Sequence, residues 1–256
     1  MKCGRNSTTE KSGLNDVTGN VVQGLRGWLA NGNYQIYDPL EANSLTLNIS
    51  DVSPLLSAFA YDCSRMAIGS FESIHDISRD DSFPKSTAWL VVRTYYAAFF
   101  AAHASLRMFG ISCSQLDSIT TNEIYKIADI FSQTNNIGSI LKGFYVCKYD
   151  VSSKKITCKR DTSGAGVHEA FWKVFNQVMR SLSIEILKNS RFPKWDQEVA
   201  VKIEELCNNL CTGQSSNGSW LSFIRNEVNY RHIFGAWYPY RDYKPYYDQL
   251  FDDSKL

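Results

Sequence analysis

The hydrophobic positions along most of the chain recur with the period of an α-helix. The pair Ser53-Pro54 predicts the N-terminus of a helix, because serine is a good N-cap and proline suits the first turn. Apolar side chains then recur every three or four residues as far as Ala67, so we expect a helix over about 54–77. The stripe comprises Leu55, Leu56, Phe59, Cys63, Met66 and Ala67.

The same period predicts further helices in the middle and in the C-terminal half of the chain. One predicted helix begins at Ser86 or Thr87 and is closed by Gly110, because glycine is typical of helix C-termini. Thr120 and Glu123 match a capping box, which predicts a shorter helix that begins near Thr120. The remaining expected helices cover about 167–189, about 195–211 and a segment that starts near Ser219.

One region has the alternating pattern of a β-hairpin instead. Residues 145–149 and 156–160 are rich in β-branched and aromatic side chains, and they flank a polar turn at Ser152-Ser153. A hairpin with a four-residue loop would place Asp150 opposite Lys155.

Together these patterns predict an all-α fold, a bundle of about six helices with an inserted β-hairpin at about 145–160. Residues 1–50 are expected to be an N-terminal leader or extension. Residues 51–256 would form the helical domain, with the hairpin insertion at 143–162 and an aromatic C-terminal tail. The aromatic residues of the tail are Trp237, Tyr238, Tyr240, Tyr243, Tyr246, Tyr247 and Phe251.

The composition excludes several classes of protein. The chain has 256 residues, of which 44% are hydrophobic, and a net charge of +1. It can therefore bury a sizeable core, and it has no overall basic character. No stretch reaches the ~20 apolar residues of a membrane-spanning helix, and the polar N-terminus lacks the apolar core of a secretory signal. We therefore expect a cytoplasmic protein that has no membrane partner.

The seven cysteines, in a chain without a secretory signal, are expected to be reduced thiols. Cys207 and Cys211 lie four positions apart on a predicted helix, and the hairpin register places Cys147 opposite Cys158. A zinc site would need all four to converge, and nothing in their spacing requires it. We predict buried thiols, no metal site and no cofactor.

The segment 225–232, Arg-Asn-Glu-Val-Asn-Tyr-Arg-His, is the most informative candidate for a functional site. The chain contains no phosphate-binding glycine motif, no nucleophile elbow and no zinc-protease motif. Two turns of a helix take about 7.2 residues, so Arg225, Asn229 and His232 are expected to share one face of the last helix.

This segment resembles the R-x4–6-H motif of the HEPN superfamily, the higher eukaryotes and prokaryotes nucleotide-binding domains. Six residues separate Arg225 from His232, and Asn226 follows the arginine directly, as is frequent in that family. Residues 93–103, which are rich in Tyr, Ala and Phe, resemble another helix of the family. The resemblance covers roughly residues 54–236, with the motif helix near the C-terminus.

The resemblance implies a metal-independent endoribonuclease that works as a homodimer, with the motif helices meeting at the subunit interface. Many such proteins are toxins or antiviral defence effectors, and RNA is the expected partner. The spacing agrees with a dimer, because Arg225 and His232 would lie ~10 Å apart along one helix. A twofold axis would bring the arginine of one copy near the histidine of the other.

The residue types indicate a role for each group. His232 is expected to remove the proton from a ribose 2′-OH or to protonate the leaving 5′ oxygen, and Arg225 to stabilise the phosphorane-like transition state. Asn226 and Asn229 are candidates for orienting the phosphate or the imidazole. The product would be a 2′,3′-cyclic phosphate, and DNA, which lacks the 2′-OH, would not be cleaved.

Several residues have a structural as well as a functional interpretation. Arg225, Glu227 and Arg231 could form a solvated helix face, and His232 could be a hydrogen-bonded interfacial histidine. Arg231 could also contact RNA. Arg93 could lend charge to the site or pair with a carboxylate. His168, which begins a helix after a glycine-rich turn, could contact RNA, whereas His103 is expected to be a hydrogen-bonded core histidine.

Two other functions stay open. A non-catalytic HEPN-like module would bind RNA, a nucleotide or a protein partner with the same surface, and a purely structural subunit is the third alternative. Some members of the family are silenced by an antitoxin that modifies a tyrosine just after the motif. Phe234 stands at that place here, which argues against this form of control and leaves room for another antitoxin or regulatory protein.

Overall fold

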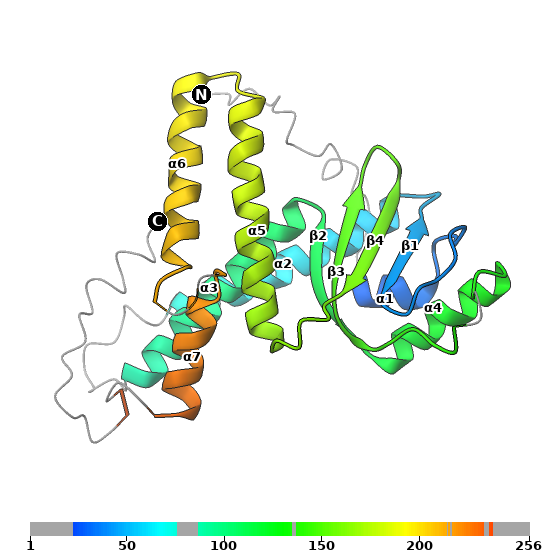
Figure 1. Ribbon diagram of the computed structural model, residues 1–256, viewed down its shortest axis with the longest axis horizontal. Helices are drawn as coiled ribbons and strands as arrows, with labels where there is room; N and C mark the ends of the chain where they lie inside the picture. Colours follow the sequence, from blue (N-terminus) through cyan, green and yellow to red (C-terminus); the bar gives the residue numbers. More distant parts are fainter. Residues whose placement is uncertain are drawn as a thin grey trace. The chain divides into compact units, whose positions relative to one another are not determined.

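A computed structural model gives the fold of the protein (Figure 1). Residues 1–22 of the expected N-terminal leader or extension and the tail beyond Trp237 lie outside the residues that it describes. The described residues are 23–75, 87–134, 137–213, 215, 217–232 and 236–237. The chain divides into two compact units, unit 1 from Met1–Ile68 and His103–Thr162 and unit 2 from Gly69–Ala102 and Ser163–Leu256.

The centre of unit 1 is a four-stranded antiparallel sheet (Figure 1). Its strands, in spatial order, are β1 (Ser44–Asn48), β4 (Lys155–Arg160), β3 (Gly143–Asp150) and β2 (Ile111–Leu116). The predicted hairpin is confirmed as β3 and β4, with Asp150 opposite Lys155 and Cys147 opposite Cys158. The hairpin therefore supplies the two central strands.

The all-α fold class predicted from the sequence is wrong, because the described residues contain this sheet as well as seven helices. The hairpin is not an isolated insertion, since β1 pairs with β4 and β2 pairs with β3. Strand β1 lies within 1–50, the range expected to be an extension, and its Leu45 and Leu47 are buried in the core. Short strands of this kind depend on pairing with distant segments, so local pattern identifies them poorly.

Two further helices contribute to the hydrophobic core of unit 1. Helix α1 (Leu25–Asn31), which also lies within 1–50, buries Leu25, Trp28 and Leu29 completely. Helix α4 (Ser118–Ile130) adds Ile124 and Ala128, with Leu116 and Tyr145 of the sheet in the same cluster. Part of the expected extension is therefore a buried component of this unit.

The N-terminus of α4 differs from the predicted capping box. The cap is Asp117, whose carboxylate accepts hydrogen bonds from the backbone N–H and the hydroxyl of Thr120, both at 2.9 Å. These hydrogen bonds lower the pKa of the Asp117 carboxyl group. An aspartate caps a helix as well as a serine does, so the prediction placed the helix correctly and misplaced its cap by three residues.

Two long helices predicted from the apolar period are confirmed as α2 (Ser53–His75) and α3 (Thr87–Met108). Gly110, which was expected to end α3, adopts a positive φ of 69° just after the helix. His103 is buried, and its Nδ1 lies 3.0 Å from Nη1 of Arg107, as expected of a core histidine. Within the described residues, none of the helices is both long and apolar enough to cross a membrane.

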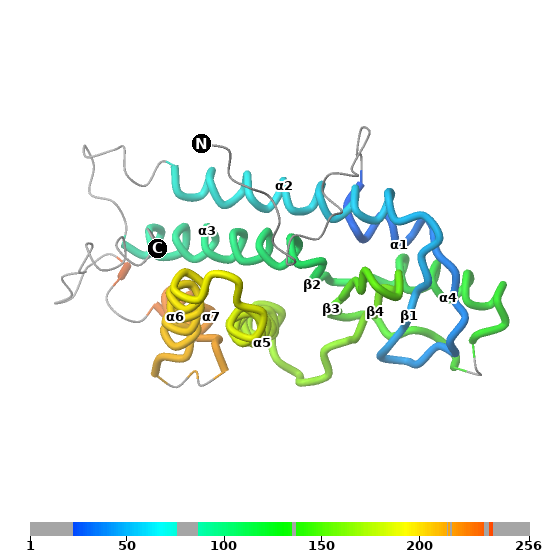
Figure 2. Tube along the Cα trace, turned by 90° about the horizontal axis from the view of Figure 1, so that it is seen from above, coloured from blue at the N-terminus to red at the C-terminus, as the bar shows by residue number. Residues whose placement is uncertain are grey.

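Unit 2 contains the three C-terminal helices that the sequence predicted. These are α5 (Val167–Lys188), α6 (Pro193–Asn209) and α7 (Trp220–Tyr230). Helices α5 and α6 lie side by side in both views (Figures 1 and 2). The first part of α3 belongs to the same unit, where Ala88 and Val92 pack against Val228 of α7.

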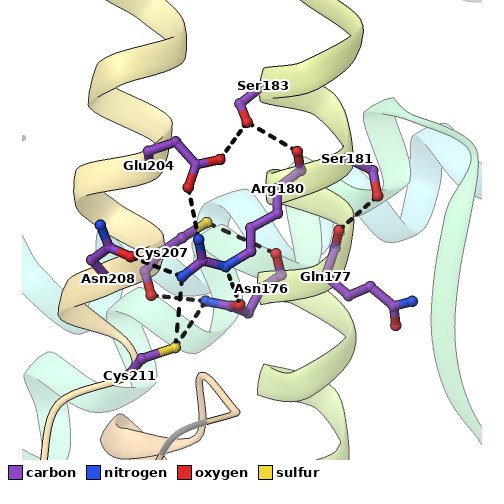
Figure 3. A network of polar contacts seen from close by, with 9 residues as sticks. All are labelled: Asn176, Gln177, Arg180, Ser181, Ser183, Glu204, Cys207, Asn208 and Cys211. Atoms are coloured by element: carbon purple, nitrogen blue, oxygen red, sulfur yellow. Dashed lines mark hydrogen bonds and ion pairs between the residues drawn. The ribbon is translucent and has the colours of Figure 1, made fainter.

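A polar network ties α5 to α6 (Figure 3). Arg180 on α5 is its centre, with Nη1 2.7 Å from Glu204 Oε2 and Nη2 donating to Asn208 Oδ1 at 2.9 Å. Its Nε donates to Asn176 on its own helix, and Ser183 donates to Glu204. Because its charged groups are paired within the network, we interpret it as a structural link that holds α5 in place.

Candidate functional site

Arg225 lies in the second turn of α7 and is only 8% exposed. Its Nη2 donates to the hydroxyl of Tyr96 on α3 at 3.0 Å, and its Nη1 donates to Oδ1 of Asn226 at 2.9 Å. Its Nε is buried and has no hydrogen-bond partner in the described residues. The fold therefore holds this guanidinium in one place.

Three tyrosine rings surround the guanidinium. Its Cζ lies 5.0 Å from the ring centre of Tyr230, 5.8 Å from that of Tyr96 and 6.0 Å from that of Tyr95. These distances are in the range of cation–π attraction. Burial acts to lower the pKa of Arg225, but the hydrogen bond to Tyr96 and the neighbouring tyrosines outweigh burial and raise the pKa. The site therefore carries a permanent positive charge.

A chain of hydrogen bonds leads from Trp172 to His168. Nε1 of Trp172 donates to the hydroxyl of Tyr95 at 3.2 Å, and the same oxygen lies 2.8 Å from Nδ1 of His168. The imidazole also packs on Phe99, with ring centres 4.6 Å apart. Trp172 and His168 come from α5 and the other two residues from α3, so the packing of two helices creates the chain.

Burial, and then the charge of Arg225, lower the pKa of His168 below its ordinary value of 6.5. Burial also raises the pKa of the Tyr95 hydroxyl, which therefore keeps its proton. At neutral pH the site thus holds the cation of Arg225, the neutral imidazole of His168 and the protonated phenol of Tyr95. We call this group the arginine–tyrosine cluster, and it consists of Arg225, Tyr95, Tyr96, His168 and Trp172.

His232, the predicted partner of Arg225, lies beyond the end of α7. The helix ends at Tyr230, and His232 has a φ of 53°, in the left-handed region. The predicted common helix face is therefore wrong for His232, although Arg225 and Asn229 do both lie on α7. The indole N–H of Trp237 donates to the carbonyl of Val228 at 2.6 Å, which satisfies a carbonyl of the last helical turn.

His232 is exposed, and its ring meets that of Trp237 with the centres 5.5 Å apart. Trp237 in turn contacts Trp89 of α3, with ring centres 5.6 Å apart. The structure thus places one histidine, His168, within the electrostatic reach of Arg225, and another, His232, at an exposed aromatic surface past the helix.

No protein-family model, curated protein or solved structure matches the chain. The resemblance to the HEPN motif therefore stays a prediction from residues 93–103 and 225–232.

The other predicted site residues differ in their surroundings. Asn226 is exposed and accepts the hydrogen bond from Arg225, so it orients the guanidinium directly. Asn229 is half-buried on α7, and Arg93 is half-buried on α3. Arg231 is exposed and forms an ion pair of 2.7 Å with Glu227.

The four cysteines considered for a zinc site do not gather in one unit. Cys147 and Cys158 are buried in β3 and β4 of unit 1, whereas Cys207 lies in the last turn of α6 and Cys211 just after that helix, both in unit 2. All six cysteines in the described part of the chain are free thiols, and all but Cys63 and Cys211 are buried. Across the described residues, no three His, Cys, Asp or Glu side chains form a group suited to a metal ion.

Sequence reasoning missed Tyr95, Tyr96 and Trp172 as site residues. The available signal was the adjacent pair Tyr95-Tyr96 in a helix that is otherwise rich in alanine and phenylalanine. An aromatic ring with a polar tip needs a hydrogen-bond partner when it is buried, so two such rings together indicate a polar cluster.

Proposed function

We propose that this protein is a metal-independent endoribonuclease that cleaves RNA through attack of the ribose 2′-OH. The observation that carries the proposal is the fixed cation of Arg225, which has His168 beside it and His232 just past the end of the same helix. A preorganised cation together with imidazoles is the set of groups that phosphodiester transesterification uses.

In the proposed step, the 2′ oxygen forms a bond to phosphorus while the bond from phosphorus to the 5′ oxygen breaks. His232 takes the proton of the 2′-OH, and the departing 5′ oxygen takes a proton from a second imidazole or from water. Arg225 stabilises the additional negative charge of the phosphorane-like transition state. The products are a 2′,3′-cyclic phosphate and a 5′-hydroxyl, so no oxidant or reductant is needed.

The contact between Asn226 and Arg225 gives RNA a way to reach the buried cation. Asn226 is exposed, and its Oδ1 is the acceptor at Nη1 of Arg225. A phosphate oxygen that displaces this amide would exchange a neutral acceptor for a charged one, and hydrogen bonds to charged acceptors are stronger. Nη2 would keep its bond to Tyr96, so the guanidinium would stay in place during the exchange.

We also propose that the active form is a homodimer, because a twofold-related copy would supply the second imidazole of the step. The surface around His232 has the composition of an interface, since Tyr230 is 64% exposed and Trp89 is 55% exposed. A role as a toxin or antiphage effector extends the proposal and depends on the motif resemblance alone.

The test is cleavage of RNA by the full-length protein in excess EDTA, measured for the wild type and two variants. His232→Ala removes an exposed imidazole, and Arg225→Lys keeps the charge while losing the forked donor. We expect each to reduce cleavage by about 10²-fold or more. The matched control is His75→Ala. His75 is an exposed histidine on α2 that lies outside the arginine–tyrosine cluster, so this variant should cleave RNA as the wild type does. Cleavage that survives both site variants would contradict the proposal.

A non-catalytic RNA-binding module is the second candidate, and one observation favours it. Both Nη atoms of Arg225 are already bonded within the protein, as they would be if the residue were structural. This candidate predicts RNA binding without cleavage in any buffer. Cleavage in EDTA that depends on His232 would exclude it.

A further inference from the structure

The hydrogen bonds of Tyr95 determine which nitrogen of His168 carries the proton. The indole N–H of Trp172 can only donate, so it occupies a lone pair of the Tyr95 oxygen. Tyr95 keeps its own proton, and the remaining partner of its hydroxyl in the described residues is Nδ1 of His168 at 2.8 Å. The phenol therefore donates to Nδ1, and the neutral imidazole carries its proton on Nε2.

Nε2 of His168 is not sealed from water, and it forms no hydrogen bond within the described residues. In the described part of the chain, three buried side-chain nitrogens have no hydrogen-bond partner. They are Nε1 of Trp28, Nε of Arg107 and Nε of Arg225. Nε2 of half-buried His168 is not among them, and the hydrogen bond formed by this ring in the described part of the chain is at Nδ1. His168 therefore offers a fixed N–H donor to a ligand.

The surroundings of this donor favour an anion. His168 is the second residue of α5, a helix of 22 residues whose N-cap, Gly166, provides no side-chain cap. The first N–H groups of such a helix carry a partial positive charge, and Arg225 adds a full one. The adjacent carboxylate of Glu169 is paired with Lys173 at 2.6 Å, so it does not oppose the anion with an unpaired charge.

We propose that His168 is a phosphate-binding residue whose Nε2–H donates to a non-bridging oxygen of an RNA phosphodiester, with Tyr95 and Trp172 as positioning residues that hold this tautomer. The inference depends on the proposed function for the identity of the ligand. It also assigns different roles to His168 and His232. A general base needs a free lone pair that faces its substrate. The lone pair of His168, on Nδ1, already accepts the hydrogen bond from Tyr95, so proton transfer belongs to His232.

The tautomer is tested by nitrogen-15 NMR of the histidine rings in the full-length protein near neutral pH. We expect His168 to carry its proton on Nε2 and none on Nδ1. Tyr95→Phe removes the donor to Nδ1, and it should give a mixture of the two tautomers. A proton on Nδ1 of the wild-type ring would overturn the inference.

The ligand is tested by fluorescence anisotropy with a labelled oligonucleotide that carries 2′-O-methyl groups throughout and is not cleavable. We expect His168→Ala to weaken binding about tenfold or more, as the loss of a hydrogen bond to a charged group does. His168→Gln places an amide N–H close to the position of Nε2 and should retain most of the affinity. His75→Ala is the matched control and should bind as the wild type does.

The outcomes separate this inference from the proposed nuclease. If unmodified RNA is not cleaved but the oligonucleotide binds in a way that depends on His168, the inference stands and the nuclease proposal fails. If RNA is cleaved but His168→Ala binds the oligonucleotide as tightly as the wild type, the inference is overturned and the nuclease proposal stands. A wild-type protein that does not bind the oligonucleotide also overturns the inference.

Discussion

The hydroxyl of Tyr96 accepts a hydrogen bond of 3.0 Å from Nη2 of Arg225, which joins α3 to α7 across 129 positions of the chain. Beside this bond, Val92 of α3 packs against Val228 of α7. The apolar contact and the polar contact together fix the position of a buried cation. This relationship is the basis of the site, because a charge that stabilises a transition state must be in place beforehand.

Replacing Tyr96 by phenylalanine should destabilise the protein while leaving the ring above Arg225. The change removes a hydrogen bond to a charged group, so we expect a loss of about 1.5–3 kcal/mol in the free energy of unfolding, measured by urea titration. Tyr230→Phe is the matched control, since that tyrosine also lies over the guanidinium but is 64% exposed. Equal effects of the two variants would show that the Tyr96 hydroxyl has no special role.

His168 should make the stability depend on pH. Its pKa is lowered in the folded protein, by burial and then by Arg225, so the unfolded chain binds a proton more readily. Its contribution is therefore present above pH 6.5, the ordinary pKa, and is lost as the pH falls through the folded pKa. The groups that face the ring are Tyr95, Tyr96 and Phe99, with the charge of Arg225 nearby.

The measurement compares the unfolding free energies of the wild type and His168→Gln at about pH 5 and about pH 8. The variant cannot titrate at this position, so it should lose less stability on acidification than the wild type. If the free energy of unfolding of the wild type fell no more on acidification than that of His168→Gln, the lowered pKa of His168 would be contradicted.

Arg231 is expected to be a structural residue rather than an RNA contact. Its partner Glu227 has a side chain that is only 7% exposed, and the ion pair measures 2.7 Å. Arg231→Ala should therefore leave a buried carboxylate unpaired and cost about 1–3 kcal/mol in thermal or urea unfolding. Adding Glu227→Gln should recover most of that loss. If Arg231→Ala were fully stable but bound RNA poorly, the RNA-contact role predicted from the sequence would be favoured.

The turn before α7 should be sensitive to substitution at Gly218. This glycine has a φ of 84°, and an added Cβ would come within 2.5 Å of the Cβ of Asn176 on α5. Gly213→Ala provides the control, because its φ of 65° is similarly unfavourable but no atom of the described residues lies within 4 Å of the added Cβ. We expect Gly213→Ala to cost about 1–2 kcal/mol and Gly218→Ala at least about 1 kcal/mol more, measured by urea unfolding. Equal losses would mean that the contact with Asn176 is easily relieved.

The sequence was sufficient for those parts of the fold that depend on local pattern. The long helices have apolar stripes over several turns, and the turn at Ser152-Ser153 sets the register that pairs Asp150 with Lys155. Strands β1 and β2 escaped prediction because each is stabilised by pairing with a hairpin strand that lies far along the chain or beyond an intervening helix. Their absence from the prediction led to the wrong fold class.

In the candidate site, too, the sequence indicated residues with local signals and missed partners that lie far along the chain. Arg225, Asn226 and His168 were identified as candidates from their residue types and local positions. The partners that define their chemistry, Tyr96 for the arginine and Tyr95 for the histidine, lie 129 and 73 positions away in the sequence. The end of α7 before His232 was also unforeseen.

The most direct test of the central claim is the chemical identity of the RNA ends that the purified protein produces in excess EDTA. The proposed attack by the 2′-OH predicts a 2′,3′-cyclic phosphate on one fragment and a 5′-hydroxyl on the other, identified by mass spectrometry, and neither product from His232→Ala. A 5′-phosphate with a 3′-hydroxyl would contradict the account, because water rather than the ribose would then have been the nucleophile.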